Sequence, residues 1–462
     1  MKSARQFCGV IVVGLVSAVL AGCATPIAYL GSPISEISPK DGYRGSRVMP
    51  QRANDDVLFI VSLSGGGMRA SAMAYGLFEQ LAADRFGTGA DAPRALDEID
   101  VISAVSGGAV PAAYFTLYGD RLFQDFENRF LNKDITASVR RGILLYPRNW
   151  LRMASSEYFR GDIYAEYFDR RLFRGATFGD LSQQGDRPFL VINATDVGLA
   201  SRFEFTQDSF DLICSDISRF PIARAVAAST LIPAVLTPIT IENHAGQCGY
   251  KLPDWASTLA KSSDFSSREY FRASVLKSRT DPARFRYLHL VDGALSDNLG
   301  ARALLDALVD GSAWMQWSRP PSSPGARKLV YISVNAGDWK STQVSMNREP
   351  PDALEMLRLM GTVPVDRYSA ETRVLLDEAL RRHAKAEQAE LYHIEIELET
   401  LRNDPQLARL VEIPTSFTLA PKDGLSLRCA TRRLLLASTD YRRLIRDISG
   451  TTITTSSKCP SS

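Results

Sequence analysis

The 462-residue sequence has little surplus charge, few histidines and few cysteines. Lysine and arginine together number 54, against 52 aspartates and glutamates, so the charge balance gives no reason to expect nucleic acid as a partner. The four histidines leave few candidates for a histidine base. Hydrophobic residues make up 45% of the chain, enough for a sizeable core, and the length favours one large domain with additions or two modest ones.

The first residues point to export. Lys2 and Arg5 form a short basic segment, and Gly9–Leu20 forms an apolar run that is shorter than the roughly 20 residues a spanning helix needs. Small residues then precede Cys23, and the whole resembles a bacterial lipoprotein signal. That resemblance implies cleavage before Cys23, lipidation of its thiol and a membrane anchor, with an ordinary signal peptide or an uncleaved anchor as alternatives. Because Ala24 carries no acidic charge, the resemblance favours the outer over the inner membrane of the cell envelope.

Four cysteines remain if Cys8 leaves with the signal and Cys23 carries lipid, and none of them shows metal-ligand spacing. An even number in an exported chain suits two disulfides. Of the three possible connectivities we expect the nearest-neighbour pairing, and four reduced cysteines are the alternative. The four residues are Cys214, Cys248, Cys429 and Cys459, paired 214–248 and 429–459.

Two strand–turn–helix units follow one another near the start of the ordered chain. Each has a short apolar, β-branched run typical of a buried strand, then a glycine turn and a helical stretch. The units are Val57–Leu63 with Ala70–Ala83, and Ile99–Val105 with Ala109–Tyr118. Later strands alternate with helices in the same way. We expect strands at Phe189–Thr195, Tyr287–Val291 and Lys328–Val334, and helices between them at Ala223–Ala228 and Ala301–Leu308. This alternation predicts an α/β fold layered around a mostly parallel sheet.

We expect the chain to be divided into four parts. They are a signal over 1–22, a tether rich in Pro, Gly, Ser and charge over 23–55, a main domain over 56–340 and an extension packed on the core over 341–462.

Two insertions are expected within the main domain. The aromatic-rich stretch 119–186 predicts a helical layer, with a lid or a lipid-touching surface as the alternative, and the polar stretch 249–286 predicts a surface excursion. In the extension, where no chemistry is evident, we expect a helix over Glu371–Ala389, a strand over Tyr392–Glu397 and a helix over Arg428–Ile448.

The second strand–turn–helix unit offers a nucleophile. Ser106 stands between a predicted strand and a helix, followed by Gly107 and Gly108, which has the form of a nucleophile elbow. Such a serine is exposed on a sharp turn where small neighbours let the backbone bend. Ala104 replaces the usual first glycine of G-x-S-x-G, and a plain turn is the alternative interpretation.

The first unit offers hydrogen-bond donors for an oxyanion. Its glycines free the backbone to turn several N–H groups toward one point at the positive end of a helix dipole. The predicted donors are Gly65, Gly66, Gly67 and Met68. A phosphate loop would end in G-K-[ST], and a dinucleotide site would have G-x-G-x-x-G, so neither pattern fits. Ser64 is a rival nucleophile, but a serine before three glycines suits a donor loop better than a rigid support.

The base for the serine is either a histidine or a carboxylate. In hydrolase order the histidine follows the acid, which leaves His383 or His393, and neither lies in a turn or glycine-rich context. Asp292 ends a buried strand, where ligands gather in such folds, although a turn aspartate bonded to nearby amides is the alternative. Burial would have to raise its pKa for it to act as a base at neutral pH. We favour Asp292 over Asp297, which is placed to cap the next helix.

Together these motifs resemble the patatin-like phospholipases. That family has a G-G-G-x-[RK]-G loop after the first strand, a G-x-S-x-G elbow and a D-G-[GA] motif. Here they stand as Gly65-Gly66-Gly67-Met68-Arg69-Ala70, Ala104-Val105-Ser106-Gly107-Gly108 and Asp292-Gly293-Ala294, with Ala70 and Ala104 as departures. The segments Arg224–Ala234 and Ser296–Gly300 also match the family's pattern, and the resemblance runs in order from about residue 56 to 340.

The resemblance implies a three-layer sandwich that carries a lipid acyl hydrolase. Ser106 and Asp292 would form a Ser–Asp dyad that acts on phospholipid or other lipid esters through an acyl-enzyme, without a metal or other cofactor. The alternatives are an acyltransferase with the same dyad and a non-catalytic lipid-binding lipoprotein of the envelope.

Overall fold

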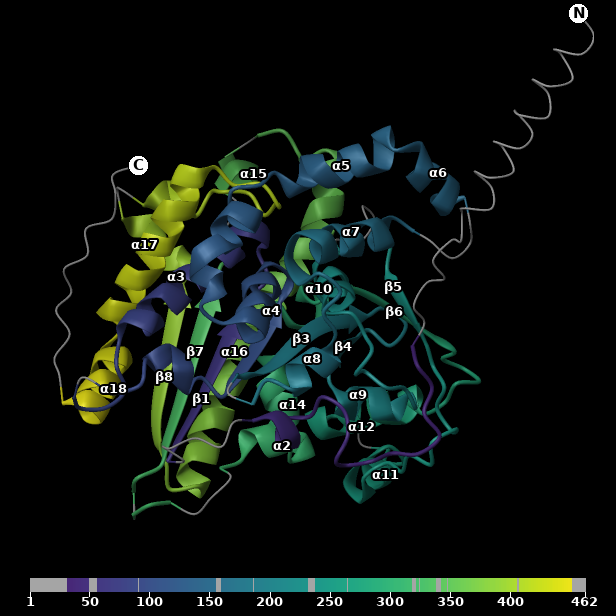
Figure 1. Ribbon diagram of the computed structural model, residues 1–462, viewed down its shortest axis with the longest axis horizontal. Coiled ribbons are helices and arrows are strands. Elements are labelled where there is room, and N and C mark those ends of the chain that lie inside the picture. Colours follow the sequence, from purple (N-terminus) through teal and green to yellow (C-terminus); the bar gives the residue numbers. More distant parts are fainter. Residues whose placement is uncertain are drawn as a thin grey trace, which may run out of the picture.

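The computed structural model describes the greater part of the chain (Figure 1). The described residues are 31–49, 56–89, 91–154, 159–185, 187–231, 237–263, 265–317, 321–323, 325–337, 342–346, 348–404 and 407–450. The expected signal, the expected lipidation site Cys23 and the cysteine at 459 lie outside these residues.

One eight-stranded sheet runs through the centre of the molecule. Its order is β5-β6-β3-β2-β1-β7-β8, and β4 pairs with β3. The strands are β1 Val57–Leu63, β2 Val101–Val105, β3 Phe189–Asp196, β4 Ser201–Glu204, β5 Ile239–Glu242, β6 Tyr287–Asp292, β7 Lys328–Asn335 and β8 Glu390–Glu397. Each strand predicted in the main domain is therefore present, within two residues at either end.

The middle of the sheet is parallel, as the alternation of strands and helices predicted. Strands β3, β2, β1, β7 and β8 run in one direction. Every residue of β1, β2 and β3 is buried, because helices cover a parallel sheet on both faces. Their carboxyl ends lie together at one end of the molecule.

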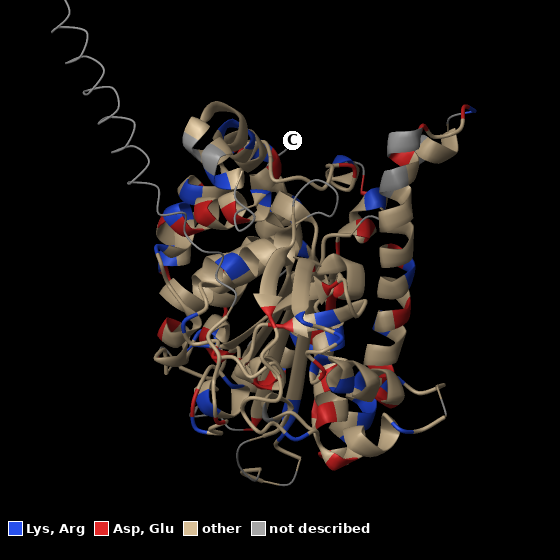
Figure 2. Cartoon of the chain, turned by 90° about the vertical axis from the view of Figure 1, so that its right-hand side faces the viewer, with Lys and Arg blue, Asp and Glu red and all other residues tan. Residues whose placement is uncertain are grey.

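Helices form a layer on each face of the sheet. Helices α3 (Gly67–Ala83), α4 (Ala109–Tyr118) and α17 (Pro421–Ala437) pack on one face, and α14 (Arg302–Asp310) and α16 (Ala353–Ala386) on the other. Figure 2 views these layers from the side, with the sheet between them. The predicted α/β three-layer sandwich is confirmed.

The remaining helices decorate this core. They are α2 Gly45–Val48, α5 Ile135–Leu145, α6 Pro147–Met153, α7 Arg160–Phe168, α8 Phe178–Ser182, α9 Gln207–Leu212, α10 Ile222–Thr230, α11 Asp254–Leu259, α12 Arg268–Arg279, α13 Ala294–Asp297, α15 Thr342–Met346 and α18 Thr439–Ser449. Short 3-10 turns cover Ala95–Glu98, Ser106–Gly108, Ala313–Met315, Leu398–Asn403 and Ala408–Leu410, and π-helical turns cover Leu122–Leu131 and Asp169–Phe173. None of the described helices combines the length and the apolar character needed to cross a bilayer.

Residues 31–49 fall within the expected tether, but they pack on the main domain. The Tyr43 ring is buried, and its hydroxyl accepts a hydrogen bond from the Leu190 N–H at 2.7 Å. Arg44 is buried beside Asp211 and Asp208. These long-range contacts are invisible in the composition of the segment, which is why it resembled a tether.

The aromatic stretch 119–186 is mainly a helical layer of the core. Phe126, Phe130, Tyr164 and Phe168 are buried and pack on one another or on Phe417 from the C-terminal extension. The prediction of a helical layer is therefore confirmed for these side chains, whereas some aromatic residues of α5 and α6 are exposed and are considered below.

The polar stretch 249–286 is more than a surface excursion. Helices α11 and α12 share a small buried apolar cluster with Leu212 of α9, around Ala256 and Ala273. At the end of α12, Arg279 is fully buried and donates to the Arg202 carbonyl oxygen at 2.7 Å. The expectation of a surface excursion is corrected. The many charged residues of this stretch masked the apolar positions at which α11 and α12 pack together.

The C-terminal extension belongs to the same body as the main domain. Strand β8 pairs with β7 along its whole length, and α17 packs on α3. The helix predicted over Arg428–Ile448 is two helices, separated at Ser438, whose hydroxyl accepts from the Tyr441 N–H and caps α18. The helix predicted from Glu371 begins 18 residues earlier, at Ala353.

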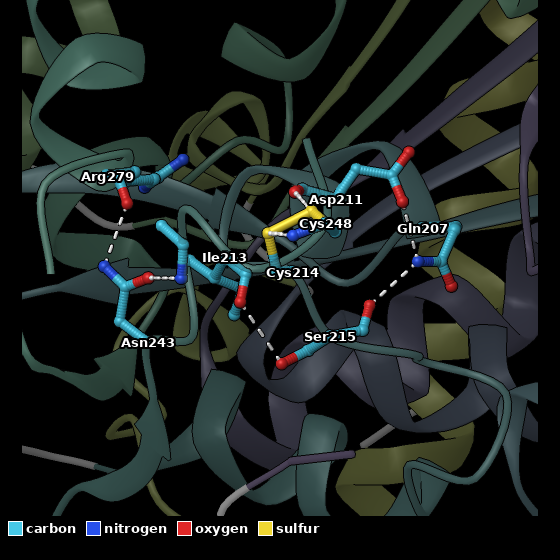
Figure 3. Close-up of a disulfide and its surroundings, with 9 residues drawn as sticks. Gln207, Asp211, Ile213, Cys214, Ser215, Asn243, Cys248 and Arg279 are labelled. Atoms are coloured by element: carbon cyan, nitrogen blue, oxygen red, sulfur yellow. Dashed lines mark hydrogen bonds between the residues drawn. A yellow bond between two sulfur atoms is a disulfide. The ribbon is translucent and has the colours of Figure 1, made fainter. Parts of the chain in front are cut away.

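A disulfide joins Cys214 to Cys248, as the nearest-neighbour pairing predicted (Figure 3). It links the turn after α9 to the loop after β5. Asn243, just before that loop, donates to the Arg279 carbonyl oxygen at 2.8 Å, so the disulfide sits within a hydrogen-bonded loop cluster. Cys429 is also disulfide-bonded, and its predicted partner lies outside the described residues.

Candidate active site

The predicted elbow is a strained turn between β2 and α4. Ser106 has a φ of +49°, in the left-handed region that costs a non-glycine residue about 1–3 kcal/mol. The residue is buried, with 4% of its surface exposed. This backbone aims the hydroxyl away from the strand, as a nucleophile elbow requires.

The glycines after Ser106 are there because two loops touch. A Cβ on Gly107 would lie 1.9 Å from the carbonyl oxygen of Gly67, and one on Gly108 would lie 2.7 Å from that of Ser64. The backbone of the elbow is therefore in direct contact with the glycine loop. The glycines of the S-G-G sequence are therefore required by this close packing of two backbones, and not only by the turn.

The structure brings Ser106 and Asp292 together. The Ser106 hydroxyl donates to Oδ2 of Asp292 at 2.9 Å, and Oδ1 accepts from the Ala294 N–H at 2.9 Å. Burial raises the pKa of Asp292 to about 6, although the Ala294 amide and the Ser106 hydroxyl act in the opposite direction. The carboxyl is thus a stronger base than an exposed aspartate and is still mostly ionised at pH 7.

Asp292 reaches the site from a strand whose direction the sequence did not reveal. Strand β6 runs antiparallel to β3, with Asp292 opposite Ala194. The chain of β6 therefore enters the sheet beyond the carboxyl end of β3. It ends at Asp292, beside Ala194 of β3 and close to the carboxyl end of β2. Gly293 follows because a Cβ there would lie 2.4 Å from the Asn193 carbonyl oxygen. The D-G pair places the carboxyl next to the elbow.

The glycine loop offers fewer oxyanion donors than predicted. The Gly65 N–H donates to the Asn298 carbonyl oxygen at 2.8 Å, and the Met68 N–H donates to that of Ser416 at 2.7 Å. These two assignments are corrected, since both amides already have partners in the fold.

Gly66 and Gly67 remain as candidate donors. Both have positive φ, at +137° and +59°, and neither N–H bonds to another backbone group among the described residues. They open α3, where amides lack partners within the helix. The Gly67 nitrogen also lies 2.8 Å from the Cβ position of Gly107, beside the elbow.

The rival catalytic residues have other partners. The buried Ser64 hydroxyl donates to the Gly65 carbonyl oxygen at 2.8 Å and accepts from the Ala336 N–H at 2.9 Å, so it fixes the loop. Asp297 accepts from the amides of α14, including that of Arg302 at 2.8 Å, and is a helix cap as predicted.

The two histidines considered as bases also bond elsewhere. The imidazole of His383 lies 3.1 Å from the Met315 carbonyl oxygen, and that of His393 lies 3.0 Å from Asp377.

Sequence reasoning missed the residues that hold the elbow from behind. The Ser106 N–H donates to the Ser229 hydroxyl at 2.8 Å, and that hydroxyl donates to the Asn193 carbonyl oxygen at 2.6 Å. The Asn193 side chain accepts from the buried Arg202 at 2.8 Å. Ser229 lies in the small-residue segment that matched the family pattern, which was its only signal.

The chain matches a protein-family model over more than half of its length. The family described as Patatin-like phospholipase matches residues 61–305, a range that holds the glycine loop, the elbow and Asp292. No curated protein matches the chain closely enough to count as a relative.

Solved structures similar to the chain include human GIVD cytosolic phospholipase A2. That match has 13% identity and a TM-score of 0.35, and it covers 73% of this chain and 54% of that chain. A second match is the human GIVD enzyme in complex with methyl gamma-linolenyl fluorophosphonate inhibitor and terbium chloride. It has 15% identity and a TM-score of 0.25, and it covers 40% of this chain and 30% of that one. The chain therefore spans about half the length of the first of these structures.

Proposed function

The chain belongs to the patatin-like phospholipase family, and we propose that it is a lipid hydrolase whose catalytic dyad is Ser106 and Asp292. The observation that carries the proposal is the 2.9 Å hydrogen bond from the Ser106 hydroxyl to the Asp292 carboxylate. The serine stands on a strained turn, and the carboxylate is buried with a raised pKa. Such a pair can hydrolyse a lipid ester through an acyl-enzyme.

Acylation starts with transfer of the hydroxyl proton to Asp292. The Ser106 oxygen forms a bond to the ester carbonyl carbon, and the carbonyl electrons move onto its oxygen. The Gly66 and Gly67 amides stabilise this oxyanion, and loss of one such donor typically costs about 3 kcal/mol of barrier. The ester C–O bond then breaks, and the leaving alcohol takes the proton from Asp292.

Deacylation repeats the sequence with water in place of the alcohol. Asp292 takes a proton from the water, whose oxygen attacks the acyl carbon, and the Gly66 and Gly67 amides again bind the oxyanion. Collapse of the intermediate releases a fatty acid, and the proton returns to the Ser106 oxygen. If an alcohol took the place of water, the acyl group would be transferred to that alcohol. The acyltransferase alternative is therefore distinguished by its product, an ester in place of a free fatty acid.

Substitution of the two buried serines tests the proposal. We expect Ser106→Ala to abolish release of fatty acid from phospholipid in mixed micelles. Ser64→Ala is the matched control, because it removes a hydroxyl of equal size from the neighbouring loop and should retain measurable activity. If Ser106→Ala hydrolyses lipid at the wild-type rate, the proposed dyad is wrong.

We also propose that the chain is a lipid-anchored protein of the cell envelope, at the outer membrane. The support is the amino-terminal sequence alone, which lies outside the described residues. Metabolic labelling with a palmitate analogue should mark the wild-type chain and fail to mark Cys23→Ala. Equal labelling of both chains would contradict the anchor.

A further inference from the structure

Exposed apolar side chains gather on helices α5 and α6 and at the residue between them. Leu144, Leu145, Tyr146 and Trp150 are 57%, 68%, 61% and 52% exposed. Single exposed apolar residues are common on protein surfaces, whereas four within seven positions form a local patch that needs an explanation. We call residues 135–153, which contain both helices, the α5–α6 segment.

The α5–α6 segment carries charge of one sign only. Its sequence, ITASVRRGILLYPRNWLRM, contains four arginines and no acidic residue. Arg140 and Arg141 are exposed next to the apolar patch. Leucine, tyrosine and tryptophan beside arginine is the composition of a segment that lies in the interface of a bilayer with anionic headgroups.

The segment is anchored to the body, so the exposure is built into the fold. Ile135 and Val139 are buried on the inner side of α5, and Asp134 caps the helix through the Ala137 N–H at 2.8 Å. The Trp150 indole N–H donates to the Ile143 carbonyl oxygen at 2.6 Å. The polar edge of the indole is therefore satisfied within the segment, and its apolar ring is left in water.

The patch lies at the end of the molecule that holds the dyad. Figure 1 shows α5 and α6 along one edge, with α7 and then α10 beneath them. Helix α7 carries the buried Tyr164, whose pKa is raised by burial and by the nearby charge of Asp292. Helix α10 carries Ser229, which holds the elbow. Helix α15 lies at this same edge, and its Met346 is 84% exposed.

We propose that the α5–α6 segment docks on an anionic lipid surface and so presents the dyad to phospholipid in the bilayer. This inference rests on the proposed function for its purpose, although binding can be measured without catalysis. The four exposed apolar side chains would insert among the headgroups, and Arg140 and Arg141 would contact their phosphates. This contact is additional to any lipid on Cys23, because it lies on the folded body and fixes its orientation.

Quenching of Trp150 fluorescence tests the contact directly. The full chain is mixed with vesicles of phosphatidylcholine and phosphatidylglycerol that contain brominated acyl chains, which quench only tryptophans in contact with the bilayer. We expect quenching in the wild-type chain and in Ser106→Ala, and its loss in Trp150→Phe. Absence of any quenching that depends on Trp150 would overturn the inference.

A second readout separates docking from chemistry. We expect Leu144→Ser/Leu145→Ser to hydrolyse vesicle phospholipid more than fivefold slower, with hydrolysis of a soluble short-chain ester unchanged. Val374→Ser and Leu425→Ser, at exposed apolar positions on α16 and α17, are the matched controls and should change neither rate. Wild-type vesicle hydrolysis by the double variant would overturn the inference, as would a drop in its oligomeric mass, which would make the patch an interface between copies. Failure of the proposed function would appear separately, as unchanged activity in Ser106→Ala.

Discussion

At the scale of single residues, burial of Asp292 links activity to an energetic cost. The carboxyl has a pKa of about 6 in the fold, compared with 3.8 in the unfolded chain. A carboxyl whose pKa rises on folding contributes most to stability below its unfolded pKa, and that contribution is lost as the pH rises through the folded pKa. The ionised base that the reaction needs is therefore destabilising at neutral pH.

Activity and stability should accordingly respond to pH in opposite directions. We expect kcat/KM to rise with pH through about 6 and then to level off, since only the ionised carboxylate accepts the Ser106 proton. Asp292→Asn should be inactive yet more stable at pH 8, by up to about 3 kcal/mol, with the difference shrinking toward pH 4. Urea unfolding at the two pH values measures this. A variant less stable than wild type at pH 8 would show that burial of the charge is not costly.

At the scale of elements, the last turn of α10 supports the elbow from behind. The Ser229 hydroxyl accepts a hydrogen bond from the Ser106 N–H and donates one to the Asn193 carbonyl oxygen, so it links the elbow to β3. The left-handed backbone of Ser106 is strained, so an external hydrogen bond helps to hold it. Ser229 is thus a positioning residue, because its hydroxyl bonds to the Ser106 backbone N–H and the Asn193 carbonyl oxygen, and its own carbonyl oxygen accepts from the Gly293 N–H at 3.2 Å.

Removal of this hydroxyl should lower turnover without weakening binding. We expect Ser229→Ala to reduce kcat about tenfold, equivalent to one hydrogen bond of about 1.4 kcal/mol, with KM unchanged. The midpoint of the pH profile should stay near 6, since the surroundings of Asp292 are retained. Steady-state kinetics of Ser229→Ala and Ser229→Thr, which restores a hydroxyl, provides the measurement. An unchanged kcat in Ser229→Ala would show that Ser229 does not position Ser106 for catalysis.

The same scale explains what the sequence could reveal. The turn at Ser106, the strand before it and the helix after it could be predicted, because each signal lies within about ten consecutive residues. The direction of β6 could not, since an apolar run is identical in parallel and antiparallel strands. Ser229 is 123 residues from its partner Ser106, and no local pattern connects them. The position of the glycine loop could be predicted. The sequence did not reveal that the Gly65 and Met68 amides already have hydrogen-bond partners in the fold.

At the scale of the whole molecule, the C-terminal extension completes the site. The Ser416 carbonyl oxygen accepts the Met68 N–H at 2.7 Å, and Arg69 donates to the carbonyl oxygens of Val411 and Ile413 at 3.2 and 2.5 Å. A Cβ on Gly67 would lie 2.4 Å from the Ser416 carbonyl oxygen. The glycine loop is therefore clamped between the elbow and a segment in which the sequence showed no chemistry.

A chain that ends at residue 340 should consequently fail to fold. It would lose β8 from the sheet and α17 from the layer over α3, which exposes buried apolar surface. We expect no cooperative thermal transition and no esterase activity. Circular dichroism during heating measures the first, and hydrolysis of a soluble ester the second. An active, cooperatively folded truncated chain would show that the extension is a separate domain.

The central claim is that Ser106 is a nucleophile activated by Asp292, and covalent labelling tests it most directly. The full chain is incubated with a fluorophosphonate, digested and mapped by mass spectrometry. We predict one phosphonate adduct, on Ser106, which persists in Ser64→Ala, is lost in Ser106→Ala and forms far more slowly in Asp292→Asn. An adduct on Ser64 in the wild-type chain, or labelling of Ser106 at an equal rate in Asp292→Asn, would contradict the account.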